Sequence, residues 1–436
     1  MTTTRAKAGG FVAGAASLAL LLSACGGGPA PTTAPTGNAP EQGGGPQTLT
    51  VAVQAWMPEK LGLKAMAEAF QDANPGVTVN LVEYADNQAL STFALQWSQG
   101  QAEQDLVVVD GASVAVQFVE QKLIIDFNQT DLFTGDNAKD QFVGESLAFT
   151  QLNDNQFAVP IGLEVYNINA NKLILAEAGL VGTDGSLPVF NTWQDVYDAA
   201  EKITQATGQP GMTIQWGPNA VATMFSVQQA MRGNLYGADG TTLTFDTPEM
   251  REMLPIWRKG AEAGIFTTDT FANKDAGRSN FNAGTLAMLL ESASRVAEAG
   301  QAIGMENTTV LAMPGSLQNG SYGFSAGIIA PSASKNQELA LKFLAEGVMS
   351  DKQVVAGEEW GKLPVLTRYF NQIDAQWKDD MYSFVSKSVP APMYKDLTKI
   401  QERGKQLLQE YLTGAIDLDQ FLTSFDEFIA SSDLGS

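Results

Sequence analysis

The chain has 436 residues, 44% of them hydrophobic, which is more apolar material than one lobe would usually bury. It contains no histidine and a single cysteine, Cys25, which excludes an internal disulfide framework and removes the commonest metal ligand and general base. The formal net charge of −22 at pH 7 makes nucleic acid and anionic lipid poor partners, and we attribute it to solubility rather than to a cationic ligand.

The first 24 residues predict an export signal. Arg5 and Lys7 supply positive charge, residues 11–22 form an apolar stretch, and residues 23–24 are small, as is typical before a cleavage point. The apolar stretch is too short to span a bilayer comfortably. We therefore expect residues 1–24 to be a signal peptide.

The single cysteine directly follows this segment. Leu22-Ser23-Ala24-Cys25 resembles the bacterial lipobox, which implies that Cys25 becomes the lipidated first residue of the mature protein; the alternative is a chance buried cysteine. The following residues, up to 47, are nearly all Gly, Pro, Thr, Ala, Asn and Gln, and they cannot bury enough apolar surface to fold. We expect residues 25–47 to be a lipidated cysteine and a flexible tether, which anchors the protein to the cell membrane in the periplasm or on the outer face.

The folded part begins with alternating strand and helix patterns. Residues 48–53 and 77–84 alternate in hydropathy as strands do, and residues 60–72 and 88–99 carry apolar side chains at helical spacing. Residues 106–109 are continuously apolar, which indicates a strand covered on both faces of a parallel sheet. Ligands of open α/β sheets bind at the carboxyl ends of such strands.

Helices dominate the middle and the end of the chain. Thr192 and Asp195 have the spacing of a capping box at a helix N-terminus. Further helices are predicted over residues 219–231, 247–263, 336–349, 394–412 and 417–430. Short strands are predicted over residues 287–290, 310–313 and 325–330.

Five motifs occur in the order in which one family has them. They are residues 157–167 (FAVPIGLEVYN), residues 176–180 with Thr192-Trp193, residues 281–288 (FNAGTLAM), residues 324–328 (FSAGI) and residues 334–344. Together they resemble the extracellular solute-binding proteins of ABC importers, specifically the large sugar-binding group that includes maltodextrin-binding proteins. The match covers most of residues 48–430. Each motif is weak alone, but five in sequence form a specific signal.

The resemblance implies an α/β protein with the type II periplasmic-binding-protein fold. Each of its two lobes would be a mixed, mostly parallel sheet flanked by helices, with a ligand cleft between the lobes and closure by hinge rotation. We expect residues 48–159 plus about 313–358 to form the N-terminal lobe, and residues 160–312 plus about 359–436 to form the C-terminal lobe. The implied function is that of a monomeric binding protein, not an enzyme, that captures a mono- or oligosaccharide and delivers it to the permease subunits of an ABC importer.

Candidate ligand contacts are rings and carboxylates at loop ends, because sugar faces stack on aromatic rings and sugar hydroxyls need hydrogen-bond partners. Trp56 follows the first strand, and Trp216 with Asn219 precedes an apolar helix, although each tryptophan could equally pack in a core. Asp110, after the apolar strand, either binds ligand or caps the following turn. Glu164 matches the crossing-strand glutamate of the family motif, and its alternative role is a salt bridge between the lobes.

The remaining candidates lie in the last third of the chain. Glu291 and Arg295 follow a predicted strand at a place where related proteins usually have Gly and Trp. They would either grip hydroxyls or an acidic group, or pair with each other. Phe324 begins the fourth motif, and Trp360 lies in a segment that resembles the family's last crossing over the cleft.

Two alternative functions stay open. The same fold could bind a phosphorylated polyol or other small anion, but phosphate requires several basic residues, and only Arg295 and Lys362 lie near the candidate positions. A secreted glycoside hydrolase would need two carboxylates ~5 to 9.5 Å apart and no histidine. We predict neither a metal site nor a cofactor, because the acidic loops at residues 131–140 and 267–275 lack calcium-loop spacing and no Gly-rich phosphate loop occurs.

Overall fold

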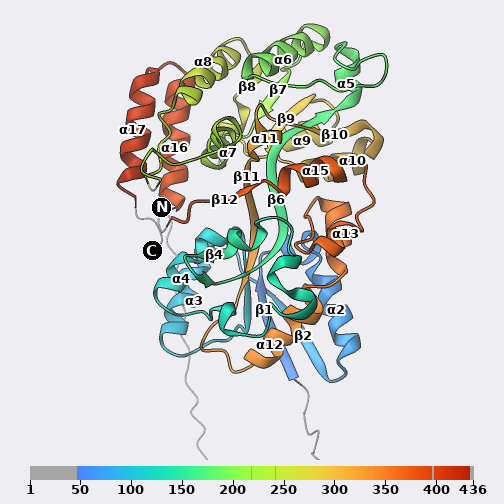
Figure 1. Ribbon diagram of the computed structural model, residues 1–436, viewed down its shortest axis with the longest axis vertical. Helices are drawn as coiled ribbons and strands as arrows, with labels where there is room; N and C mark the ends of the chain where they lie inside the picture. The colour runs from blue at the N-terminus through green and yellow to red at the C-terminus, as the bar shows by residue number, and fades with distance from the viewer. Residues whose placement is uncertain (1–46, 218, 241, 395–396, 433–436) are drawn as a thin grey trace, which may run out of the picture. The chain divides into compact units, whose positions relative to one another are not determined.

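The computed structural model describes residues 47–217, 219–240, 242–394 and 397–432. The predicted signal peptide, Cys25 and all of the predicted tether except Gln47 lie outside these residues. The described residues belong to one compact unit of the chain, in which two groups of helices and strands are joined by long crossing strands (Figure 1).

Ten of the strands in the described residues form one mixed sheet. Its order is β2 (Val77–Glu83), β1 (Gln47–Val53), β3 (Leu106–Val109), β11 (Tyr322–Ile329), β6 (Val159–Asn171), β9 (Met288–Ser292), β7 (Met212–Ile214) and β8 (Phe266–Thr267). β10 (Thr308–Leu311) also pairs with β6, and β12 (Val389–Pro390) also pairs with β11. A separate hairpin consists of β4 (Gln151–Leu152) and β5 (Asn155–Gln156).

The direction of pairing changes along this order. β1 is parallel to β2 and β3, and β7 is parallel to β8 and β9, so each end of the sheet is parallel. β6 and β11 lie between these ends and are antiparallel to their neighbours. The sheet is therefore the mixed, two-part α/β arrangement expected from the sequence.

β6 and β11 each pass from one hydrophobic core to another. All thirteen residues of β6 are buried; Val159 to Val165 contribute to the core built on β1 and β3, and Tyr166 to Ala170 to the core built on β7 and β9. β11 runs in the opposite direction, from Tyr322 beside the second core to Ile328 within the first. We call the part around β1, β2 and β3 the first lobe, and the part around β7, β8 and β9 the second lobe.

Helices cover both lobes (Figure 1). Those of the first lobe include α1 (Met57–Lys60), α2 (Leu63–Ala73), α3 (Ala89–Ser98), α4 (Val116–Glu120), α12 (Gln337–Lys342, continued by a π-helix over Phe343–Val348), α13 (Lys352–Trp360), α14 (Thr367–Phe370) and α15 (Lys378–Val385). Those of the second lobe include α5 (Lys172–Glu177), α6 (Trp193–Thr207), α7 (Ala220–Arg232), α8 (Pro248–Glu262), α9 (Ala276–Asn282), α11 (Ser316–Asn319), α16 (Leu397–Leu412) and α17 (Leu418–Ala430). α10 (Arg295–Ile303) follows β9 and packs Val296 and Ala297 into the first-lobe core.

Most predicted elements occur within a few residues of their expected ends. The run at residues 106–109 is β3, and the capping box of Thr192 and Asp195 is present at the start of α6, with both hydrogen bonds formed. α13, α14 and α15 were not predicted; the segment interpreted as a crossing over the cleft begins at Trp360, the last residue of α13.

The packing of residues 363–385 differs from the expected lobe assignment. Leu363, Phe370, Trp377 and Phe384 belong to the same core as β1 and β3, whereas Ile400 and Leu408 of α16 belong to the second-lobe core. Since β12 pairs with β11 after this segment, we propose that the last passage to the second lobe lies near β12 rather than near residue 359.

Candidate ligand-binding site

A cavity of about 680 Å³ lies where the two lobes meet the crossing strands. The first lobe lines it with residues from the loops after β1, β2 and β3, which include Trp56, Asp86 and Asp110. The second lobe contributes residues near the starts of α7 and α9 and the end of β9. Parallel strands end together at one edge of a sheet, which explains why these distant loops converge.

Glu164 of β6 lies at the floor of the cavity and is fully occupied by protein partners. One carboxylate oxygen forms an ion pair with Lys362, and the other accepts hydrogen bonds from the hydroxyls of Ser292 (2.5 Å) and Ser294 (2.8 Å). Burial alone would raise the pKa of Glu164, but the positive charges of Lys362 and Arg295 and these hydrogen bonds lower it to about 2. The carboxylate stays ionised, and its role is to hold Lys362 and the end of β9 in place.

Glu291 at the end of β9 pairs with a residue that the sequence did not single out. The Nε of Arg278, in α9, donates to Glu291 Oε1 at 2.8 Å, whereas the Nε of Arg295 is 3.6 Å from the same oxygen. Arg295 instead donates to Glu298 at 2.8 Å, and Glu298 also pairs with Lys60 at 2.6 Å. The mutual pair of Glu291 and Arg295, one of the two predicted alternatives, is thus the longest contact in a network of five ion pairs, which Arg278 extends to Asp275.

Asp110 lies immediately after β3 with its carboxylate exposed to the cavity. The walls of the cavity surround it on several sides, and this desolvation raises the pKa of Asp110 above its usual value, with Lys362 acting in the opposite direction. No side-chain hydrogen bond caps the turn that begins at Gly111, so the alternative role of Asp110 as a turn cap is not formed among the described residues.

Three aromatic rings from the crossing strands form a cluster beside the cavity. The ring centroids of Tyr166 and Phe324 are 5.6 Å apart, and that of Tyr322 is 6.0 Å from Phe324 and 6.3 Å from Tyr166. All three line the cavity. On the first-lobe side, the ring of half-buried Trp56 also lines it, and its Nε1 donates to Gln54 Oε1 at 3.0 Å.

Of the candidate contacts named from the sequence, the structure brings seven together at this cavity: Trp56, Asp110, Glu164, Asn219, Glu291, Arg295 and Phe324. Trp360 is not among the lining residues; it ends α13, and Lys60 Nζ lies 4.5 Å from its ring centroid. Cys25 lies outside the described residues.

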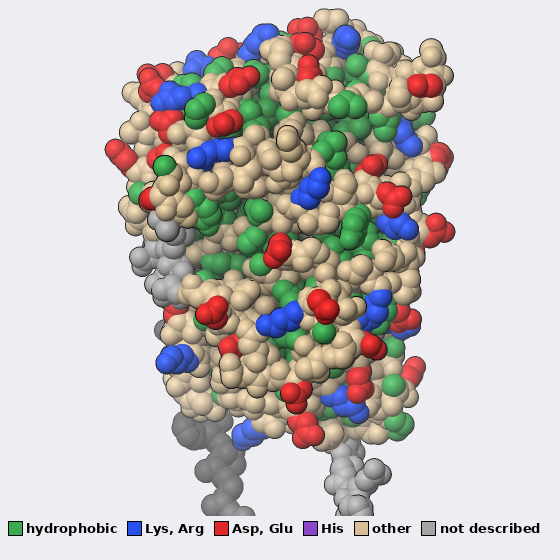
Figure 2. Space-filling model, viewed as in Figure 1, with side chains coloured by type: hydrophobic (Ala, Val, Ile, Leu, Met, Phe, Trp, Pro, Cys, Tyr) green, Lys and Arg blue, Asp and Glu red, His purple; other side chains and the backbone are tan. Residues whose placement is uncertain are grey.

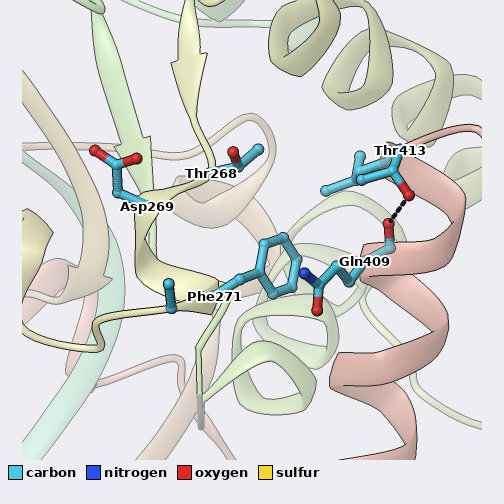
Figure 3. A pocket seen from close by; sticks show the side chains of 7 residues that line it. Thr268, Asp269, Phe271, Gln409 and Thr413 are labelled. Carbon is cyan, nitrogen blue, oxygen red and sulfur yellow. Dashed lines mark hydrogen bonds between the residues drawn. The ribbon is translucent and has the colours of Figure 1, made fainter.

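Trp216 also lies away from the cavity, fully buried in the second-lobe core. Its ring stacks on Phe271 at 5.6 Å and packs against Trp257 at 6.0 Å. Phe271 in turn lines a smaller hollow of about 300 Å³ with Asp269 and with Gln409 of α16 (Figure 3). Trp216 therefore supports the wall of this second hollow and has no exposed face to offer a ligand.

Among the lining residues that sequence reasoning missed are Tyr166, Lys274, Arg278 and Tyr322. Tyr166 belongs to the first of the five motifs and Tyr322 lies two residues before the fourth, so the motifs could have identified both. Lys274 and Arg278 belong to no motif, and only their contacts in the folded chain reveal them: Arg278 bonds to Glu291 of β9, and the carbonyl of Lys274 accepts from Gln215. The cavity thus holds more basic residues than the two predicted near it.

Two features are absent from the described part of the chain. No group of three or more His, Cys, Asp or Glu side chains there is placed to hold a metal ion. None of the helices in those same residues is long and apolar enough to cross a membrane.

Solved structures similar to this chain are solute-binding proteins. The GacH receptor of Streptomyces glaucescens, solved unliganded and with acarbose, has 19% identity, covers 88% of this chain and 97% of its own, and gives a TM-score of 0.71. Maltose-bound MalE3 of T. maritima has 16% identity, with 88% and 99% coverage and a TM-score of 0.72. A substrate-binding protein of Listeria monocytogenes in complex with cycloalternan has 19% identity, with 88% and 98% coverage and a TM-score of 0.71.

These similarities confirm the expected fold, and they rest on shared architecture at low identity. A comparison with the sequences of curated proteins finds no match. The family model described as bacterial extracellular solute-binding protein matches residues 65–382, which is most of the chain. The chain therefore belongs to the bacterial extracellular solute-binding proteins.

Proposed function

We propose that this protein captures a neutral sugar in the cavity between its lobes and delivers it to the permease of an ABC importer. The observation that carries the proposal is that one cavity joins an aromatic cluster, Tyr166, Tyr322 and Phe324, to a ring of hydrogen-bonding side chains from both lobes. Aromatic rings bind the apolar face of a sugar, while polar groups fix its hydroxyls. The volume of about 680 Å³ lies within the range of small-molecule sites.

The similar structures support this ligand class. Their descriptions name acarbose, maltose and cycloalternan, which are all carbohydrates or carbohydrate analogues. Membership in an extracellular family places the protein outside the cytoplasm. We further propose that Cys25 carries the lipid anchor, that the protein acts as a monomer and that the permease subunits recognise the ligand-bound form.

Ion pairing within the cavity favours a neutral ligand over a phosphorylated one. Five basic side chains line it, namely Lys60, Lys274, Arg278, Arg295 and Lys362. All except Lys274 pair with a carboxylate in the described structure, so little uncompensated positive charge remains for a phosphate. The anion alternative therefore has weaker support than a sugar.

The two glutamates that line the cavity do not support a glycoside hydrolase. A general acid must be protonated near neutral pH, but the pKa of Glu164 is about 2 because Lys362 and Arg295 stabilise its charge against burial. The carboxylate of Glu291 forms ion pairs with the guanidinium groups of Arg278 and Arg295. We propose binding without catalysis.

A thermal-shift screen tests the proposal directly. The purified protein is heated with a panel of neutral mono- and oligosaccharides and, in parallel, with sugar phosphates, and each mixture is then assayed for new reducing ends. A ligand at a hundredfold excess over its Kd should stabilise the fold by about 2.7 kcal/mol and raise Tm while staying intact. A panel without any Tm increase would contradict sugar binding, and new reducing ends would identify a hydrolase.

The aromatic cluster provides a sharper test. Phe324→Ala should weaken binding of the best neutral sugar roughly tenfold, as measured by isothermal titration. Without the ring, the sugar loses stacking and apolar contact that contribute about 1.4 kcal/mol to the binding free energy. Tyr382→Ala is the matched control, since Tyr382 is 40% exposed on α15 and does not line the cavity. Equal affinities for both variants would contradict a stacking role for Phe324.

A further inference from the structure

The charged side chains of the cavity fall into two groups. Most of them are held in ion pairs or in a local turn: Lys362 pairs with Glu164, Arg278 with Glu291, and Asp86 accepts from the backbone N–H of Gln88 at 2.8 Å. Asp110 and Lys274 are different. Within the described part of the chain, neither side chain has a hydrogen-bond or ion-pair partner, and both line the cavity.

These two charges belong to opposite lobes and have opposite sign. Asp110 ends β3 in the first lobe, and Lys274 precedes α9 in the second. The backbone of Lys274 is fixed, because its carbonyl accepts a hydrogen bond from Gln215 Nε2 at 2.9 Å. α9 is also fixed against the sheet, since a Cβ at Gly277 would lie 2.7 Å from a methyl carbon of Thr213.

The electrostatics of such a pair depend on the ligand between them. A hydroxyl group both donates and accepts, so a diol can donate to Asp110 and accept from Lys274 at the same time. A ligand carboxylate satisfies Lys274 but is repelled by Asp110, and a ligand ammonium satisfies Asp110 but is repelled by Lys274. Low-dielectric walls strengthen both repulsions relative to bulk water.

We propose that Asp110 and Lys274 act together as a charge filter that selects neutral, hydroxyl-rich ligands over both acidic and basic ones. The filter rests on the proposed function, because it assigns specificity to the same cavity. It gives a role to the two charged side chains of the cavity that form no hydrogen bond or ion pair within the described residues: each can bind one end of a neutral polar ligand.

The test uses variants that remove one charge at a time. Asp110→Asn and Lys274→Met keep similar size, and neither removes an ion pair, so both should fold. Isothermal titration measures three probes for each protein: glucose or galactose, whichever binds better, the corresponding uronate and the corresponding amino sugar. The pH is chosen so that the carboxylate is ionised and the amine protonated.

The unmodified protein should bind the neutral sugar at least tenfold more tightly than either charged analogue. Asp110→Asn should reduce the discrimination against the uronate about tenfold without helping the amino sugar, and Lys274→Met should do the reverse. Asp269→Asn is the matched control for Asp110→Asn: this exposed acid lies outside the cavity, and its substitution changes the net charge by the same amount and in the same direction. Its selectivity should equal that of the unmodified protein.

The outcomes separate the filter from the underlying function. If neither neutral monosaccharide binds, the titrations are repeated with the best neutral oligosaccharide of the thermal screen and with its oxidised and aminated forms. If no neutral sugar binds at all, the proposed function itself is rejected. If a neutral sugar binds but the two variants leave discrimination unchanged, or change it as Asp269→Asn does, the filter is rejected while sugar binding stands.

Discussion

At the scale of single residues, Glu164 shows how a predicted ligand contact can have a different role. Its position at the floor of the cavity agrees with the family motif, yet Lys362, Ser292 and Ser294 occupy both of its oxygens. A buried ion pair costs desolvation, which the extra hydroxyl bonds offset. We therefore assign Glu164 a positioning role. It holds the ammonium group of Lys362, and the remaining N–H bonds of that ammonium group face the cavity.

Glu164→Gln should lower the free energy of unfolding by about 3 kcal/mol at neutral pH, since it leaves the ammonium of Lys362 buried without its partner. The pKa of Glu164 falls from its ordinary value of 4.5 to about 2 on folding, so its ionisation stabilises the fold fully above pH 4.5 and progressively less as pH falls to about 2. Urea unfolding of both proteins at pH 7 and pH 3 checks this: their difference should shrink at the lower pH. Exposed Glu177→Gln is the control and should change stability little at either pH.

Residue types and positions along the chain predicted most of the cavity but not the direction of each side chain. Trp56 and Trp216 both follow a strand, yet only Trp56 faces the cavity, because the ring of Trp216 fills the space between Phe271 and Trp257. Lys274 and Arg278 were not predicted because their place in the fold, and not the direction of their side chains, was unknown. Nothing in the sequence near them indicates which strand α9 will lie against.

At the scale of elements, the long strand β6 contains an irregularity at the junction of the lobes. Ser325 pairs with Leu163 and Ala326 with Ile161, so Gly162 has no partner on β11 and forms a bulge. Gly162 has φ = 67°, and a Cβ there would lie 2.7 Å from a methyl carbon of Leu61. The family resemblance implied a crossing strand here, but no pattern of apolar residues could reveal where its register shifts.

Gly162→Ala should destabilise the protein by about 2 kcal/mol or more, because it adds a steric clash to an unfavourable left-handed conformation. Gly179→Ala isolates the conformational part, since Gly179 has φ = 66° but no atom within 4 Å of its would-be Cβ. Chemical denaturation of both variants measures the difference. A loss for Gly162→Ala no larger than for Gly179→Ala would show that contact with Leu61 is unimportant.

At the scale of the whole molecule, charged side chains of both signs are distributed over the surface, and the positive and negative charges that line the cavity nearly cancel. Acidic and basic side chains are interspersed over the face drawn in Figure 2, in agreement with the interpretation of the net charge of −22 as a solubility feature. Within the cavity, by contrast, six of the nine charged side chains that line it form ion pairs with residues of opposite sign. The overall charge therefore gives no guide to the charge of the ligand.

The arrangement of crossing strands predicts a closing motion. β6, β11 and the segment around β12 link two otherwise separate cores, so small backbone changes near the bulge at Gly162 can rotate one lobe against the other. A ligand that contacts Asp110 on one lobe and Lys274 on the other favours the closed state, because only there can it satisfy both. Small-angle scattering should show a smaller radius of gyration with saturating neutral sugar than without it. The Asp110→Asn, Lys274→Met double variant should show less compaction at equal occupancy, and identical scattering of the liganded and unliganded protein would contradict closure.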